Sequence, residues 1–358
     1  MKSNLKSIIK KVVFSVLPLL LLLIFLEVSA RCLYFEETGK SSERFALTFT
    51  FNKLKLKVLS KIAEMRVDGL PNAEALGRAF YSQQGNELRT ALKKEYEDNF
   101  KVLIRETQAV SSTFAVLYMP SDDYKNSIAQ KESREFYVNL AKKYNVLLID
   151  LTDKFFAYNP EITTLLPENG HLSRFGNQLV AEELSLFIDQ NTNYQAGFHF
   201  QKRPKLLGPL SANDESIWLY SFSMPYRVQT NKQGLRMDYD LVFPKQKQRV
   251  LFLGDSFTFG PYLPNHDIFC GLLQKKYPDK EILNGGAAGY TITDELSLFQ
   301  ERAKYTEPDL TVLQVLDNDI FGLFFLKRNE FDRKKQARQP SSVEVEFLNK
   351  IKNNLSEN

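Results

Sequence analysis

The feature that most constrains the fold is a set of short, continuous apolar runs, each ending in a polar or glycine-rich turn. Such runs are typical of parallel strands buried on both faces, whereas a half-buried strand alternates apolar and polar residues. Helical sequence follows several of the runs, so strand-helix-strand units are expected instead of hairpins. We therefore predict an α/β protein with one parallel sheet of about five strands. The predicted strands are 113–119, 145–150, 249–253, 281–283 and 310–316.

Polar residues stand at the ends of the strands predicted in the second half of the chain. Gly254, Asp255 and Ser256 follow one strand, and Asp317, Asn318 and Asp319 follow another. In open parallel sheets the carboxyl ends of the strands line the active crevice. A serine placed directly after a buried strand exposes its hydroxyl there, as a nucleophile requires. The residues alone leave a second interpretation open, in which Asp255 and Ser256 only cap the next helix.

Charge and cysteine content exclude several classes of function. The formal charge is +4, from 47 basic and 43 acidic side chains, which is too balanced for a protein that binds nucleic acid. Cys32 and Cys270 have no C-x-x-C or metal-like spacing. We therefore expect no nucleic-acid partner, no structural zinc and no disulfide framework, and the motifs imply no metal or organic cofactor.

The N-terminal region predicts a membrane anchor. Residues 12–26 are almost wholly apolar, a basic segment (1–11) with four lysines precedes them, and Glu27 follows. Lysine before and acid after the segment orient its N-terminus toward the cytoplasm. We predict a transmembrane signal anchor at 12–30. A cleaved signal peptide stays open, because the apolar run is shorter than the roughly 20 residues that span a bilayer. Both interpretations place residues 40–358 outside the cytoplasm, and the predicted anchor would hold them at the cytoplasmic membrane.

Three stretches of the second half resemble conserved blocks of the SGNH/GDSL hydrolase family. They are Val250–Gly260 (VLFLGDSFTFG), Asn284–Tyr290 (NGGAAGY) and Pro308–Asp319 (PDLTVLQVLDND). Asn231–Arg236 (NKQGLR) resembles the lead-in to the first block in bacterial members.

The resemblance implies a nucleophile and an oxyanion hole. Ser256 would attack an ester carbonyl, and the resulting oxyanion would be held by the backbone N–H groups of Ser256 and Gly289 and by the side-chain amide of Asn318. Such donors are costly to remove in enzymes that use them.

A fourth stretch, Pro167–Leu184 (PENGHLSRFGNQLVAEEL), resembles the family's histidine block and implies that His171 is the general base. The other two histidines, His199 and His266, are interpreted as structural or exposed. The family has Asp three residues before the histidine, where this chain has Glu168, which can still orient the imidazole. If the working position is two residues before the histidine, it is occupied by Asn169.

The order of the blocks is inverted with respect to the family. Residues 41–190 resemble its second half and 248–358 its first half, with a connector at 191–247. We predict one circularly permuted domain, a three-layer α/β/α sandwich with a flavodoxin-like parallel sheet. Half-domains that do not close, or halves exchanged between two chains, stay open, as does the oligomeric state.

The predicted function is that of a membrane-anchored, extracytoplasmic serine esterase with a triad of Ser256, His171 and Glu168. Its partner would be an ester-bearing small molecule, lipid or glycan, with O-acetyl or lipid esters expected. Two alternatives remain: an O-acyltransferase on cell-surface glycans that uses the same residues, and a non-catalytic binding or scaffold protein.

Overall fold

The computed structural model describes residues 26–28, 77, 79–121, 128–166, 169–191, 200–218, 226–325, 343 and 346. Apart from 26–28 and 169, all of them belong to one compact unit. The anchor predicted at 12–30 lies outside the described residues except for its positions 26–28. Of the helices within these ranges, none has both the length and the apolar character that a bilayer crossing requires.

The core of this unit is a five-stranded sheet in the order β2-β1-β9-β7-β8, and every neighbouring pair in it is parallel. This confirms the predicted parallel sheet. β1 lies beside β9 from Thr113 opposite Leu310 to Tyr118 opposite Val315. Strands from the two distant halves of one chain therefore share a single sheet. The strands are β1 (Thr113–Tyr118), β2 (Leu147–Asp150), β7 (Gln248–Leu253), β8 (Lys280–Asn284) and β9 (Leu310–Val315).

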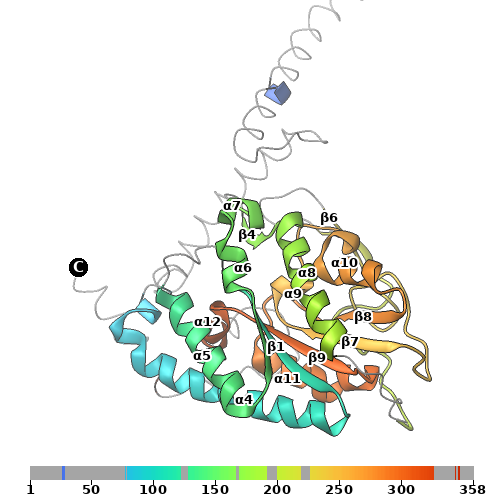
Figure 1. Cartoon of the computed structure of the whole chain (residues 1–358), viewed down its shortest axis with the longest axis horizontal. Helices are drawn as coiled ribbons and strands as arrows, with labels where there is room; N and C mark the ends of the chain where they lie inside the picture. Colours follow the sequence, from blue (N-terminus) through green and yellow to red (C-terminus); the bar gives the residue numbers. More distant parts are fainter. Residues whose placement is uncertain are drawn as a thin grey trace, which may run out of the picture. The chain divides into compact units, whose positions relative to one another are not determined.

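Helices cover both faces of the sheet (Figure 1). Side chains alternate along each strand, so that Val116 of β1 enters one core and Leu117 the other. Burial on both faces explains why the strands read as continuous apolar runs. One layer contains α4 (Asn86–Ala109), α5 (Ile128–Tyr144), α11 (Ile292–Glu301) and α12 (Asn318–Phe325), and the other contains α6 (Thr152–Phe156), α8 (Arg174–Asn191) and α10 (Phe269–Lys276).

The long helix α4 was not delimited by the sequence pattern. Its buried residues include Leu88, Leu92, Tyr96 and Phe100, which are spaced at four-residue intervals and therefore lie on one face. That face packs against α11 and α12. Charged residues occupy most of the remaining positions, so the apolar stripe is narrow and weak as a sequence signal.

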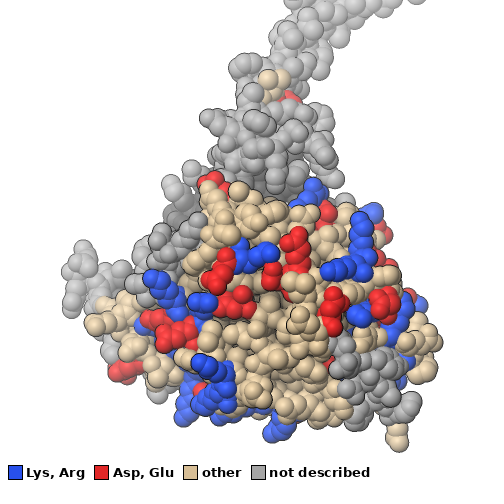
Figure 2. Space-filling view, in the orientation of Figure 1, with Lys and Arg blue, Asp and Glu red and all other residues tan. Residues whose placement is uncertain are grey.

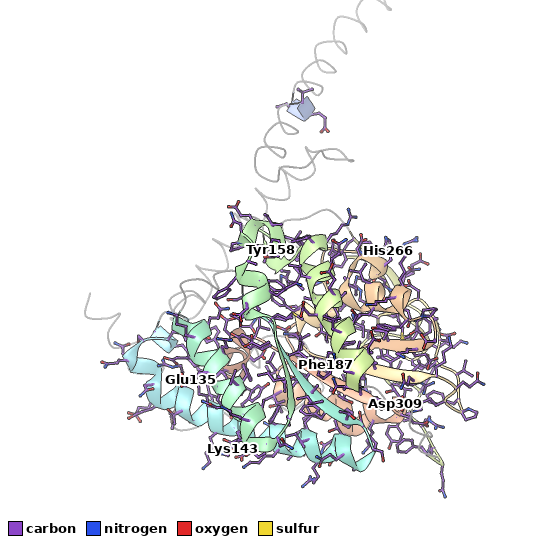
Figure 3. All side chains as sticks on the ribbon, in the orientation of Figure 1. Glu135, Lys143, Tyr158, Phe187, His266 and Asp309 are labelled. Carbon is purple, nitrogen blue, oxygen red and sulfur yellow. The ribbon has the colours of Figure 1, made fainter. Side chains whose placement is uncertain are left out.

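Part of the segment predicted as a connector joins one of the cores beside the sheet, through Leu207, Leu235 and Leu241. It contains a hairpin of β5 (Glu215–Trp218) and β6 (Tyr226–Gln229). Further along, Lys245 forms a buried ion pair of 2.9 Å with Asp309, the residue that precedes β9 (Figure 3). Lys245 thus ties the end of this segment to the amino-terminal edge of the sheet, whereas the Arg236 N–H donates to the carbonyl of Asn284, at the carboxyl end of β8.

The charged side chains on the face shown in Figure 2 are of both signs and intermixed. Exposed ion pairs occur on the described surface, such as Arg227 with Glu215 at 2.6 Å. Exposed pairs of this kind contribute about 0–1 kcal/mol each, so the buried pairs matter more for stability.

Candidate active site

Ser256 begins the one-turn helix α9 (Ser256–Phe259) directly after β7. The cap of this helix is Asp255, whose Oδ1 accepts a hydrogen bond from the Phe257 backbone N–H at 2.9 Å. Gly260 ends the helix in the left-handed conformation, and its N–H donates to the Ser256 carbonyl at 2.8 Å. Because Asp255 supplies the cap, the Ser256 hydroxyl is available for another partner.

That partner is His171. Its Nε2 lies 2.8 Å from Ser256 Oγ, although the two residues are 85 positions apart in the chain. His171 lies on β4 (Asn169–Leu172), which pairs with the short strand β3 (Thr164–Leu165). In the tautomer that carries its proton on Nδ1, the imidazole can accept the serine proton at Nε2.

Hydrogen bonds around Ser173 fix the strand that carries the histidine. The Ser173 N–H donates to the Thr163 carbonyl at 2.9 Å, and its hydroxyl accepts from the Gly176 N–H at 3.0 Å, at the start of α8. α8 in turn contacts α10, where the Phe269 N–H donates to Asn177 Oδ1 at 2.8 Å. The histidine block is therefore joined directly to the part of the chain that follows the serine block.

Two aromatic rings contact the His171 imidazole. The Phe257 ring is stacked on it, with centroids 5.0 Å apart and an interplanar angle of 30°. The Tyr262 ring meets it edge-on at 5.6 Å and 63°. Burial lowers the pKa of His171 from 6.5 to about 4, so the ring is neutral at pH 7 and has a lone pair to accept a proton.

The glycine-rich turn after β8 packs against the serine turn. Asn284 Nδ2 donates to the Thr258 carbonyl at 2.9 Å. A Cβ on Gly286 would lie 2.4 Å from the Phe259 backbone nitrogen, so only glycine permits this approach. Gly289 has a φ of 77° and faces open space, because a Cβ placed there would meet no atom within 4 Å.

Asn318 is the first residue of α12 and is exposed at the end of β9. Ser256, Gly289 and Asn318 thus follow β7, β8 and β9, which are neighbours in the sheet. The structure brings all three to the same edge as His171. Hydrogen bonding between the Asn318 side chain and the Asp255 carboxyl links the asparagine to the serine turn.

The structure describes only some of the other residues considered in the sequence. Glu168 lies outside the described residues, and Asn169 is described only as the first residue of β4, so the third member of the triad stays a prediction. His199 also lies outside them. The His266 side chain is 76% exposed in the 3₁₀ helix η2 (Asn265–Asp267), at the rim of the unit (Figure 3).

Sequence reasoning missed a set of buried carboxyl groups close to the strand ends. Burial raises the pKa of Asp255 to about 6, although hydrogen bonds from Phe257 N–H and Asn318 oppose the rise. Burial and the neighbouring acids also raise the pKa values of Glu295 and Asp319. Asp319 Oδ2 accepts from the Leu316 N–H at 3.1 Å and so shapes the turn before Asn318. The sequence signals polar turn residues here but not their burial.

In the sequence, Arg236 stands out only as the last residue of the stretch Asn231–Arg236, and no pattern indicates a role for Tyr262. Arg236 proves to be fully buried beneath the segment that follows α9. No spacing rule singles out Tyr262, because its contact with His171 comes from a left-handed turn and not from a regular element. Among the described residues, no group of His, Cys, Asp and Glu side chains is arranged to hold a metal ion.

Searches with protein-family models and among curated proteins give no match. Eight solved chains match in structure. The chain is similar to the O-acetyltransferase domain of Pseudomonas putida AlgJ, with 14% identity and a TM-score of 0.45 over 73% of this chain and 91% of that chain. It is similar to Bacillus cereus PatB1 with a sulfonyl adduct, with 10% identity and a TM-score of 0.37 over 64% and 88%. It is also similar to Pseudomonas aeruginosa AlgX, with 13% identity and a TM-score of 0.37 over 65% and 59%. These identities and TM-scores are too low for an activity to be transferred.

Proposed function

We propose that this chain is a serine esterase of the SGNH type, with its sequence blocks in permuted order. The observation that carries the proposal is the 2.8 Å contact between Ser256 Oγ and His171 Nε2 at the carboxyl edge of a parallel sheet. A neutral imidazole beside a serine hydroxyl, both half-buried, is the arrangement that activates a serine nucleophile.

The proposed reaction forms and then breaks an acyl-serine ester. Ser256 Oγ attacks the ester carbonyl while His171 Nε2 takes the hydroxyl proton. The tetrahedral intermediate collapses, the bond to the alcohol breaks, and the imidazolium returns the proton to the leaving oxygen. Water then attacks the acyl-serine in the same way and releases the acid. The oxyanion would be held by the N–H groups of Ser256 and Gly289 and by the Asn318 amide, and such donors lower the barrier by about 2.7–4 kcal/mol each.

Glu168 is proposed to accept the His171 Nδ1–H and to stabilise the imidazolium formed in the reaction. A pKa of about 4 makes His171 a weak base by itself, and an anion beside Nδ1 would raise it. We expect Glu168→Gln to lower kcat strongly with little change in KM. If Asn169→Gln has that effect and Glu168→Gln does not, the acceptor is at position 169.

A fluorophosphonate probe tests the nucleophile. The full-length chain should be labelled, Ser256→Ala should abolish labelling, and His171→Ala should slow it by orders of magnitude. His266→Ala is the matched control, because this exposed histidine should leave labelling unchanged. A folded wild-type chain that is not labelled would favour a non-catalytic binding or scaffold protein.

The fate of the acyl group separates hydrolysis from transfer. A sugar hydroxyl in place of water would give an acetylated glycan through the same residues. We propose O-acetyl or lipid esters as substrates and hydrolysis as the reaction. Mass spectrometry of products formed from p-nitrophenyl acetate with and without an oligosaccharide acceptor tests this, since acceptor acetylation in preference to acetate release would show a transferase.

We also propose that residues 12–30 anchor the chain in the cytoplasmic membrane with its catalytic domain outside. The support is the apolar run with lysines before it and acid after it. Protease added to intact spheroplasts should digest the domain. A chain that stays protected until the membrane is permeabilised would contradict the proposed orientation.

A further inference from the structure

We propose that Tyr262 is a positioning residue for His171. Its ring closes the side of the imidazole that Phe257 does not cover, directs Nε2 toward Ser256 and excludes water. The inference rests on the proposed function, in which His171 is the base.

The two aromatic contacts differ in their origin. Phe257 follows Ser256 in α9, so its stacking on His171 is tied to the serine itself. Tyr262 lies beyond the end of α9 and meets the imidazole edge-on. Such edge-to-face contacts orient aromatic rings. Tyr262 therefore fixes the imidazole from a separate segment of the chain.

The backbone at Tyr262 is held in an unusual conformation. Its φ is 70°, in the left-handed region that bulky residues rarely adopt. Strained residues of this kind persist where the surroundings over-determine them, and they cluster at functional sites. Here the residue with the strained backbone, Tyr262, is also the residue whose ring contacts His171, the candidate base.

Arg236 holds the segment on both sides of Tyr262. Its guanidinium donates to the Gly260 carbonyl at 2.7 Å and to the Leu263 carbonyl at 2.5 Å. The Tyr226 ring, at 5.8 Å, supports Tyr262 from the hairpin of β5 and β6. The fully buried arginine thus leaves the tyrosine little freedom to move away from His171.

Among the described residues, burial is the cause of the lowered His171 pKa, and the charged groups nearby have partners of their own. Arg174 of α8 is paired with Asp267 of η2 at 2.7 Å, and their charges offset one another. Asp255, at the cap of α9, is turned toward Phe257 N–H and Asn318. On β4 itself, the predicted acid Glu168 lies outside the described residues. Burial is the cause of the lowered His171 pKa, and the Tyr262 ring is part of what buries it.

The test measures the His171 pKa directly by NMR, using full-length protein labelled at histidine. The chain has three histidines, so the His171 signal is assigned from its loss in His171→Gln. We expect Tyr262→Gly, which removes the ring and relieves the left-handed strain, to raise the pKa from about 4 toward 6.5. Tyr262→Phe keeps the ring and should restore the low value.

Kinetics with p-nitrophenyl acetate give the second readout. The acid limb of kcat/KM should move to higher pH in Tyr262→Gly, and kcat should fall more than KM rises, with rescue in Tyr262→Phe. Tyr305→Ala is the control, because this tyrosine contacts Phe200 instead of His171. An unchanged His171 pKa in folded Tyr262→Gly would overturn the inference. Wild-type protein that fails to react with fluorophosphonate would instead overturn the proposed function, while the NMR result still decides whether Tyr262 shields the imidazole.

Discussion

Replacing Arg236 with methionine tests how much one buried cation contributes to the serine turn. Its guanidinium makes four hydrogen bonds to buried acceptors: the Asn265 side chain at 2.9 Å and the carbonyls of Phe259, Gly260 and Leu263 at 2.6, 2.7 and 2.5 Å. Methionine keeps an apolar stem of similar length but donates to none of them.

The magnitude follows from two opposing effects. Hydrogen bonds to charged groups contribute about 1.5–3 kcal/mol each, so four of them contribute roughly 6–12 kcal/mol. Burial lowers the pKa of Arg236 from 12.5 to about 10, which corresponds to a desolvation cost of roughly 3 kcal/mol. We therefore expect Arg236→Met to lower the free energy of unfolding by at least about 3 kcal/mol.

Urea unfolding followed by circular dichroism measures this loss as a shift of the midpoint. The matched control is Arg227→Met on β6, because Arg227 is 62% exposed and its partner Glu215 52% exposed. That pair should contribute under about 1 kcal/mol. Equal and small losses for the two variants would refute the reasoning that buried carbonyls depend on Arg236.

Three further outcomes are expected. Asp309→Ala should lower the free energy of unfolding by about 3–5 kcal/mol, because it removes the buried carboxylate that pairs with Lys245 and accepts from the Arg249 N–H. The exposed Asp98→Ala should stay within about 0.5 kcal/mol, and similar urea midpoints for the two variants would contradict this. Gly286→Ala should displace α9 and reduce fluorophosphonate labelling at least tenfold, since its Cβ would lie 2.4 Å from the Phe259 backbone nitrogen of that helix. Gly77→Ala is the control, because a Cβ there meets no atom within 4 Å; equal labelling of the two variants would show that the turn accommodates the methyl group without displacing α9. The pKa of His171 is near 6.5 in the unfolded chain and about 4 in the folded chain, so the free energy of unfolding should fall as the pH drops between these values, by up to about 1.4 kcal/mol per pH unit. Urea midpoints measured across this range check the slope, and His171→Gln should lack it.

The parallel sheet was predictable because its strands are buried on both faces, which leaves a plain apolar signature. The helix α4 was not delimited, since its apolar stripe is narrow and charged residues fill the rest of its surface. The packing of the segment before β7 was also beyond prediction. This segment is held by contacts between distant side chains, such as that of Lys245 with the buried Asp309. The periodicity of apolar residues does not indicate contacts of this kind.

The sequence by itself determined which residue types stand at the strand ends, because local patterns mark where a buried strand stops. It placed Ser256 after β7 and Asn318 after β9, and it singled out His171 among three histidines. Only the tertiary structure decided that β1 lies against β9 and that His171 meets Ser256 across 85 residues. It also decided that the Tyr262 ring meets the His171 imidazole edge-on. These are long-range contacts, and their free energy depends on packing and burial that no local stretch of sequence contains.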